Sequence, residues 1–173
     1  MSLNYFELFG LNPIFNIDLA ILESAYRKIQ SETHPDRFVT ATATEKLSSM
    51  QQSTLANEAY QCLRNPASRA KYLLELQGIT AISETNTAMP TEFLMQQMEW
   101  REAIEDASSA LDITALENIL DEIRADAKKL QTDLIDLLDI KKDYVSATDA
   151  TRKLIFMDKV SEDINRAIEQ LDT

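Results

Sequence analysis

Apolar residues recur every three or four positions along almost the whole chain, which is the spacing of one face of an α-helix. Only two glycines and four prolines are present in 173 residues, so the chain has few places at which it can turn. The pattern therefore predicts an all-α protein.

The first part of the chain begins with two predicted helices. The segment NYFELFGL gives one or two helical turns and stops at Gly10. Either Asn16 or Asp18 can cap a second helix. This helix must end near Thr33, because Pro35 disfavours helical geometry at the residue before it. Its apolar stripe consists of Leu19, Leu22, Tyr26 and Ile29.

Two more helices are expected before residue 78. The third starts near Glu45 and ends at Asn65, where Pro66 suits the first position of the fourth. The fourth runs to about Gln77 and is closed by Gly78. The apolar stripe of the third helix consists of Leu47, Met50, Leu55, Ala59 and Leu63.

A polar stretch, GITAISETNTAMP, indicates a domain boundary. We therefore divide the chain into a first domain (1–77), a linker (78–89) and a second domain (90–173). Short breaks near residues 112 and 147 favour three antiparallel helices in one bundle over the alternative, an intermolecular coiled coil. The three stripes are Phe93, Trp100, Ile104, Ala107 and Leu111; Leu116, Leu120, Ile123, Ala127, Leu130, Leu134 and Leu137; and Ala150, Leu154, Met157, Ile164, Ile168 and Leu171.

The formal net charge of −12 is unevenly distributed. Residues 1–77 hold seven Lys and Arg against eight Asp and Glu, whereas residues 78–173 hold ten against twenty-one. No basic stripe is present, so nucleic-acid binding is not expected. No run of about 18 apolar residues is present either, which argues against a membrane span. The start of the chain lacks the features of a secretory signal, and a single cysteine, Cys62, fits a reducing cytoplasm.

The only histidine lies in the segment QSETHPDRF, and it raises the question of catalysis. His34 and Asp36 could form a general acid–base pair. No activated nucleophile or glycine-rich phosphate loop accompanies them, and one imidazole with one carboxylate is too few ligands for a metal. On these residues alone, a plain helix-ending turn is the favoured interpretation.

The surroundings of this turn resemble a J-domain, the DnaJ-type module that stimulates a DnaK-class chaperone ATPase. The resemblance rests on YFELFGL, on Tyr26-Arg27-Lys28, on His34-Pro35-Asp36 and on Asn57-Glu58-Ala59-Tyr60, in this order. The family often has lysine where this chain has Arg37.

The resemblance implies that the ATPase binds the turn and the basic face of the preceding helix. The residues carried over are Tyr26, Arg27, Lys28, His34, Pro35, Asp36 and Arg37. A proline-rigidified turn loses little entropy on binding, and the cations would steer an acidic partner surface.

A second candidate surface lies at the start of the second domain. On a helical wheel, Met95 and Met98 fall roughly 130–170° from the stripe of Phe93 and Trp100, with Leu94 at their edge. The acidic residues Glu99, Glu102 and Asp106 share this face, and on the last helix Ile155 and Phe156 also lie off the buried stripe. A flexible apolar patch surrounded by carboxylates is typical of a protein-docking surface, although these residues could also cover a neighbouring helix.

The segments TEFLMQQMEWREAIE and RKLIFMDK, together with the J-domain, resemble the HscB family of co-chaperones. The resemblance implies an L-shaped molecule, with a J-domain joined to a three-helix bundle, and a role in iron–sulfur cluster assembly. The partners implied are an HscA-like ATPase and an IscU-like scaffold protein. The positions carried over for scaffold binding are Leu94, Met95, Met98, Glu99, Glu102, Asp106 and Phe156, with Asp106 in place of a family glutamate.

The sequence thus predicts a cytoplasmic bacterial co-chaperone that is not an enzyme and needs no cofactor or metal. It leaves self-association open. The main alternative is a J-domain co-chaperone with an unrelated client. Two further interpretations are a helical assembly protein and a small enzyme that uses His34 and Asp36.

Overall fold

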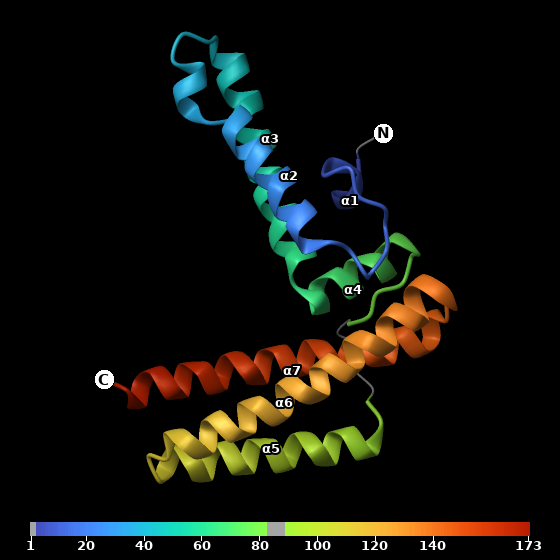
Figure 1. The fold of residues 1–173 in the computed structure, drawn as a ribbon, viewed down its shortest axis with the longest axis vertical. Helices are drawn as coiled ribbons and strands as arrows, with labels where there is room; N and C mark the ends of the chain where they lie inside the picture. Colours follow the sequence, from blue (N-terminus) through green and yellow to red (C-terminus); the bar gives the residue numbers. More distant parts are fainter. Residues whose placement is uncertain (1–2, 83–88) are drawn as a thin grey trace. The chain divides into compact units, whose positions relative to one another are not determined.

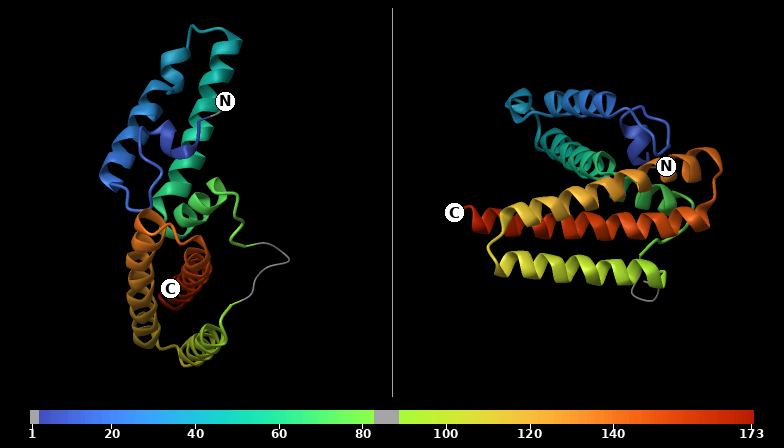
Figure 2. Two further views of the ribbon diagram at one scale, coloured as in Figure 1. Left: turned by 90° about the vertical axis from the view of Figure 1, so that its right-hand side faces the viewer. Right: turned by 60° about the horizontal axis from the view of Figure 1, so that its bottom comes forward.

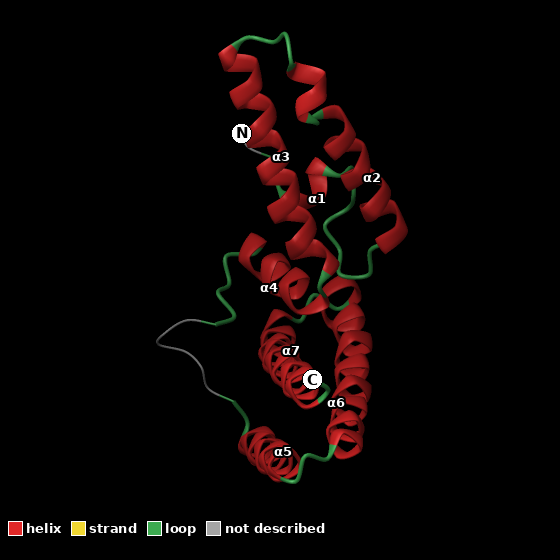
Figure 3. Cartoon of the chain, turned by 90° about the vertical axis from the view of Figure 1, so that its left-hand side faces the viewer, coloured by secondary structure: helices red, strands yellow, loops and turns green. Residues whose placement is uncertain are grey.

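The computed structural model describes residues 3–82 and 89–173, and every regular element in these ranges is a helix (Figures 1 and 3). The expected all-α fold is therefore confirmed. The chain forms two compact units, Met1–Leu73 and Leu74–Thr173. Of the predicted linker, 78–89, residues 83–88 lie outside the described part of the chain. None of the described helices is long and apolar enough to cross a membrane.

The N-terminal unit begins with α1 (Tyr5–Leu8), one turn that is capped by the side chain of Asn4. Gly10 follows with φ +68°, a left-handed conformation that glycine adopts without steric cost. The ring of Tyr5 stacks on that of Tyr72 with centroids 4.6 Å apart. This contact and the buried side chain of Phe6 fix α1 against the rest of the unit.

Helices α2 (Leu19–Glu32) and α3 (Ala43–Arg64) lie side by side as a hairpin (Figures 1 and 2). Of the two candidate caps for α2, the structure uses Asp18, whose carboxylate accepts the Ala20 and Ile21 amides at 2.9 and 3.3 Å. Helix α2 ends at Thr33, as Pro35 predicts. Helix α4 (Pro66–Leu76) begins at the expected proline.

The predicted stripe of α3 is wrong in its first half. Leu47, Met50 and Leu55 are exposed, and the buried face consists instead of Ser49, Ala56, Ala59 and Leu63. Small side chains let α2 and α3 approach closely, but they contribute little to the hydrophobic pattern of the sequence. The large apolar residues of α3 dominate this pattern, and they therefore indicate the wrong face as the buried one. In α2, Leu19 is also exposed, whereas Leu22 and Ile29 are buried as predicted.

The C-terminal unit is a bundle of α5 (Thr91–Ser109), α6 (Ile113–Leu134) and α7 (Tyr144–Leu171) (Figures 1 and 2). Short connections make successive helices antiparallel, and the predicted stripes meet in one core. The core consists of Phe93, Trp100, Ala107, Leu116, Leu120, Ile123, Met157, Val160 and Ile164.

Two details of the bundle differ from the prediction. Leu111 is exposed because α5 has already ended, and its φ of +55° directs the chain out of the stripe. The second break lies at 141–143, before Tyr144, and not near residue 147. A π-helical segment, η2 (Ile135–Ile140), extends α6 up to this break and buries Leu138 in place of the predicted Leu137.

An arginine of α7 forms a hydrogen bond with the first part of the C-terminal unit. Arg152 is buried, and its Nε donates a hydrogen bond to the carbonyl of Ala81 at 2.5 Å. A buried guanidinium needs such acceptors, because an unpaired buried charge is strongly destabilising. The contact fixes the chain directly before residue 83 against the bundle.

Candidate functional site

The His-Pro-Asp turn is a single 3₁₀ turn, η1 (Pro35–Phe38), that follows α2. His34 is its N-cap, and the Arg37 amide donates to the His34 carbonyl at 3.0 Å. Proline at the first position fixes one backbone angle and removes an amide that would otherwise need a partner. The backbone of the turn is therefore restrained by proline and by its own hydrogen bond.

The imidazole of His34 helps to shape the turn. Its Nδ1 accepts the amide of Asp36 at 3.2 Å. The Asp36 carboxylate lies 3.6 Å from the same nitrogen, and the two side chains are 59% and 88% exposed. Both polar side chains are therefore accessible to a partner.

The three predicted cations differ in their surroundings. Arg27 is already paired with Glu23, one helical turn earlier, at 2.6 Å. Lys28 and Arg37 are exposed and form no ion pair within the residues that the structure describes. Lys28 and Arg37 can therefore meet an acidic surface at full charge, whereas Arg27 must first give up or share Glu23.

Tyr26 is held inside the hairpin. Its ring stacks on Tyr60 with centroids 4.1 Å apart, and its hydroxyl donates to Asn57 Oδ1. Gln30 Nε2 donates to the same hydroxyl at 2.6 Å. Two motif segments that are about 30 positions apart in the sequence are thereby joined across α2 and α3. Tyr26 thus supports the helix that carries the cations, and part of its ring stays accessible.

The α5 surface consists of the predicted residues Leu94, Met95, Met98, Glu99, Glu102 and Asp106, and all six are exposed. Met95 is 59% and Met98 70% exposed, whereas Phe93 and Trp100 on the other face are buried. The helical wheel therefore places this surface correctly. The carboxylates form no ion pair within the described part of the chain.

Phe156 of α7 borders the α5 surface and is partly buried against the bundle core. Its ring packs edge-on against Phe93, with centroids 5.8 Å apart. On its other side, the guanidinium carbon of Arg101 lies 5.6 Å from the ring centre. The structure thus brings Phe156 to α5, in agreement with both sequence interpretations, because the ring covers Phe93 and remains partly accessible.

Arg101 was missed by the sequence reasoning. It lies three positions after Met98, so helical spacing puts it beside the α5 surface. Its position over an aromatic ring from another helix could not be read from the sequence. A cation–π contact of this kind stabilises by about 0.5–1 kcal/mol at an exposed site, and it fixes the orientation of Phe156.

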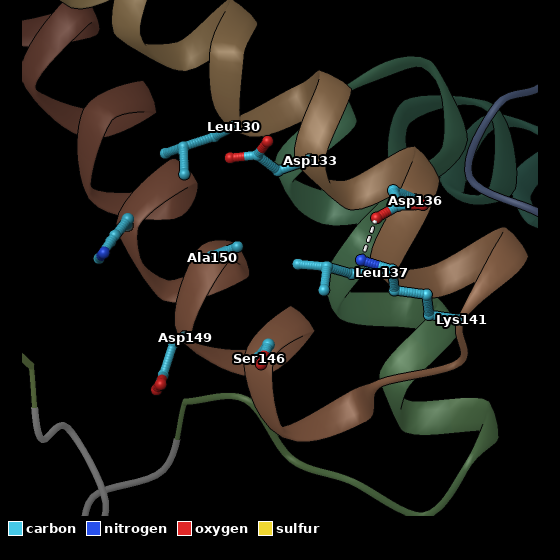
Figure 4. Close-up of a pocket in the computed structure, with 9 residues that line it drawn as sticks. Leu130, Asp133, Asp136, Leu137, Lys141, Ser146, Asp149 and Ala150 are labelled. Carbon is cyan, nitrogen blue, oxygen red and sulfur yellow. Dashed lines mark ion pairs between the residues drawn. The ribbon is translucent and has the colours of Figure 1, made fainter.

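The bundle also has an open hollow of about 390 Å³ between the end of α6, η2 and the start of α7 (Figure 4). Lys141 and Asp136 form an ion pair at 2.9 Å on its wall. The hydrogen bond and charge of Asp136 raise the pKa of Lys141, and a hydrogen bond from Ser146 lowers the pKa of Asp143, the cap of α7. No predicted site residue lines this hollow.

The two predicted sets of residues lie on different units. The turn and its cations belong to Met1–Leu73, and the α5 surface with Phe156 belongs to Leu74–Thr173. In the ranges 3–82 and 89–173, no three His, Cys, Asp or Glu side chains gather as a metal site would require. The chain therefore offers two separate surfaces with different chemistry.

Comparison with known proteins gives one consistent family. A family model described as the HSCB C-terminal oligomerisation domain matches residues 89–165. The co-chaperone protein HscB homolog of Azoarcus sp. is 45% identical, over 98% of this chain and 96% of its own.

Solved structures extend the similarity to three dimensions. Chaperone HscB from Vibrio cholerae is 37% identical, with a TM-score of 0.83 over 98% of this chain and 99% of its own. Human co-chaperone protein HscB is 32% identical, with a TM-score of 0.85 over 95% of this chain and 81% of its own. The similarity spans both units and includes the turn as well as the α5 surface, so the chain belongs to the HscB family of J-type co-chaperones.

Proposed function

We propose that this co-chaperone works in iron–sulfur cluster assembly by bringing an IscU-like scaffold protein to an HscA-like chaperone ATPase. The His-Pro-Asp turn would stimulate ATP hydrolysis in the ATPase, and the α5 surface with Phe156 would hold the scaffold. ATP hydrolysis would then coincide with delivery, which favours tight capture of the scaffold and assists cluster transfer.

One observation carries this proposal: the chain presents two exposed surfaces of different chemistry on two separate units. The turn combines a restrained backbone with two exposed polar side chains, those of His34 and Asp36. The α5 surface combines two exposed methionines with three carboxylates that form no ion pair with any described residue. Charge on each surface would guide association, and the apolar groups of the α5 surface would supply most of the affinity for the scaffold.

We also propose that the chain catalyses no reaction itself and acts in the bacterial cytoplasm. His34 is the only histidine, and the carboxylate nearest to it is 88% exposed. A general acid or base works best when burial and neighbouring groups tune it, and here both groups face open solvent. The only chemistry needed is ATP hydrolysis, and it takes place in the partner.

The proposal is tested by a binding titration and a turnover assay. The full chain is titrated with the IscU-like scaffold by calorimetry, alone and then with the HscA-like ATPase and ATP. ATP turnover of the ATPase is measured with the native chain and with His34→Gln, which replaces the imidazole by a side chain that can still accept a hydrogen bond from a backbone amide.

We expect micromolar or tighter scaffold binding by both proteins, and stimulation of turnover by the native chain only. Stimulation that survives in His34→Gln would show that the turn is only structural. Absence of scaffold binding at micromolar concentration would favour the alternative of a J-domain co-chaperone with a different client.

A further inference from the structure

A small apolar cavity lies beside the His-Pro-Asp turn, between η1 and the first half of α3. Its volume is about 280 Å³, and its walls include Pro35, Phe38, Val39 and Met50. Sites that enclose a whole small molecule usually measure roughly 300–1,000 Å³. This cavity lies at the lower end of that range, and its volume is also sufficient for one side chain of a partner protein.

The polar groups at the back of the cavity are already engaged. The hydroxyl of Thr33 donates to the Ile29 carbonyl at 2.8 Å, and the hydroxyl of Ser49 donates to the Thr33 carbonyl at 3.0 Å. Neither hydroxyl proton is left for an occupant, so a polar group that reached the back of the cavity would lose water without gaining a donor there. The ammonium of Lys46 also lines the cavity, but it belongs to an exposed residue. The back of the cavity therefore favours an apolar occupant.

The apolar residues around the opening are not needed to hold the hairpin together. Val39 is 70% and Met50 66% exposed, and Leu47 beside them is exposed as well. The contact between α2 and α3 uses the small side chains of Ser49, Ala56 and Ala59. Grouped apolar side chains that face solvent and do not serve the core indicate an interaction site.

We infer that this cavity receives an apolar side chain of the DnaK-class ATPase, with an acidic residue of the same partner beside it. This inference rests on the proposed function. Pro35 belongs both to the turn and to the cavity wall, so a partner that covers the turn also covers the opening. Lys46 lines the cavity and forms no ion pair within the described residues, so it can meet the acidic group.

The cavity thus has a different task from the turn. His34 and Asp36 act on ATP hydrolysis, whereas the cavity adds affinity and fixes the orientation of the bound partner. A change in the cavity should therefore shift the concentration of co-chaperone that gives half-maximal stimulation, and leave maximal stimulation unchanged.

The test compares Met50→Gln and Val39→Thr with a matched control, Leu55→Gln. Leu55 lies on the same helix and is 42% exposed, about 140° around the axis from Met50. We expect Met50→Gln to raise the half-maximal concentration about tenfold, as the loss of an interface anchor does. Val39→Thr should raise it several-fold, and the control should stay within twofold of the native chain.

Each outcome separates this inference from the proposed function. If His34→Gln abolishes stimulation while both cavity variants match the control, the inference fails and the proposed function stands. If His34→Gln has no effect, the proposed function fails and the inference with it. Since both side chains are exposed, the melting temperatures should match the native value, which shows that the effect is not caused by unfolding.

The acidic neighbour is tested with Lys46→Glu. At low salt we expect association with the ATPase to slow several-fold, and high salt should remove most of the difference. If the effect of Lys46→Glu on the association rate does not depend on salt, the partner has no acidic residue opposite Lys46. Sedimentation equilibrium of native and Met50→Gln chains tests a second copy of this chain as the occupant, and a change in self-association without a change in ATPase stimulation would overturn the inference.

Discussion

The His-Pro-Asp turn and the α5 surface differ in how the chain holds their side chains. The turn has a backbone fixed by proline and by internal hydrogen bonds, and it presents a few polar groups in one geometry. The α5 surface lies on a regular helix, and its methionines have several rotatable bonds and are mostly exposed. A rigid polar contact suits a geometric trigger, whereas flexible apolar side chains suit capture of a protein surface.

The two surfaces also differ in charge. Lys28 and Arg37 near the turn are unpaired cations within the described residues, and Glu99, Glu102 and Asp106 on α5 are unpaired anions there. An acidic ATPase surface and a basic scaffold surface would each be repelled from the wrong site. Under the proposed function, this difference would direct each partner to its own site before contact.

The largest effect is expected at Asp36. Asp36→Asn keeps the shape of the side chain but removes the exposed negative charge and one acceptor. Stimulation of ATP turnover should be abolished while the dissociation constant for the scaffold, measured by calorimetry, stays within twofold. Loss of both functions together would contradict the separation of the two surfaces.

The next effect is expected on the α5 surface. Met98→Ala and Phe156→Ala should each weaken scaffold binding by about 1–2 kcal/mol, because truncation of an interface anchor removes well-packed apolar area. Val145→Ala is the matched control, since Val145 is an exposed apolar residue of α7 outside this surface. If both variants bind the scaffold with unchanged affinity, these side chains do not take part in scaffold binding.

Stability distinguishes the two residues of this pair. Met98 is exposed, so its truncation should leave the melting temperature unchanged. Phe156 packs on Phe93, so its truncation should cost about 1–2 kcal/mol of folding free energy, less than the roughly 3–5 kcal/mol of a fully buried phenylalanine. Thermal unfolding followed by circular dichroism measures both.

A smaller effect concerns the charges of α2. Lys28→Ala and Arg27→Ala should each slow association with the ATPase several-fold, because each variant removes one positive charge. Glu23→Ala removes the negative charge paired with Arg27 and should raise the rate. Stopped-flow association at low salt measures all three, and a rate that does not rise in Glu23→Ala would show that this carboxylate does not weaken steering.

The smallest effect concerns salt. Added salt should slow association at both surfaces, because both rely on complementary charge that is screened beyond about 8–10 Å near physiological ionic strength. Scaffold binding should keep more of its affinity, since its apolar contacts are not screened. If the association rate at one of the two surfaces does not change with salt, charge does not steer the partner to that surface.

The sequence predicts the C-terminal bundle better than the N-terminal hairpin, and packing explains why. In α5 to α7, large apolar residues such as Phe93, Trp100 and Leu120 form the contacts, so hydrophobic spacing marks the buried face. In α3 the contact is made by Ser49, Ala56 and Ala59, which carry little hydropathy. Where two helices must approach closely, small side chains form the contact. The positions of large apolar residues then indicate the wrong face of the helix.

The site shows a similar limit. The exposure of His34 and Met98 follows from a local motif and from helical spacing, and both could be predicted. The contacts of Tyr26 with Asn57 and of Arg101 with Phe156 join different helices. Such contacts depend on the rotation of one helix against another, which a single sequence does not specify.

The exposed thioethers of Met95 and Met98 give the α5 surface a chemical vulnerability. Oxidants convert methionine to its sulfoxide, which is polar, and reductases reverse the change. Neither side chain supports the core, so oxidation would leave the bundle folded while it removes the apolar centre of the surface. A co-chaperone that captures its client in this way would release it under oxidative stress and regain it when the methionines are reduced.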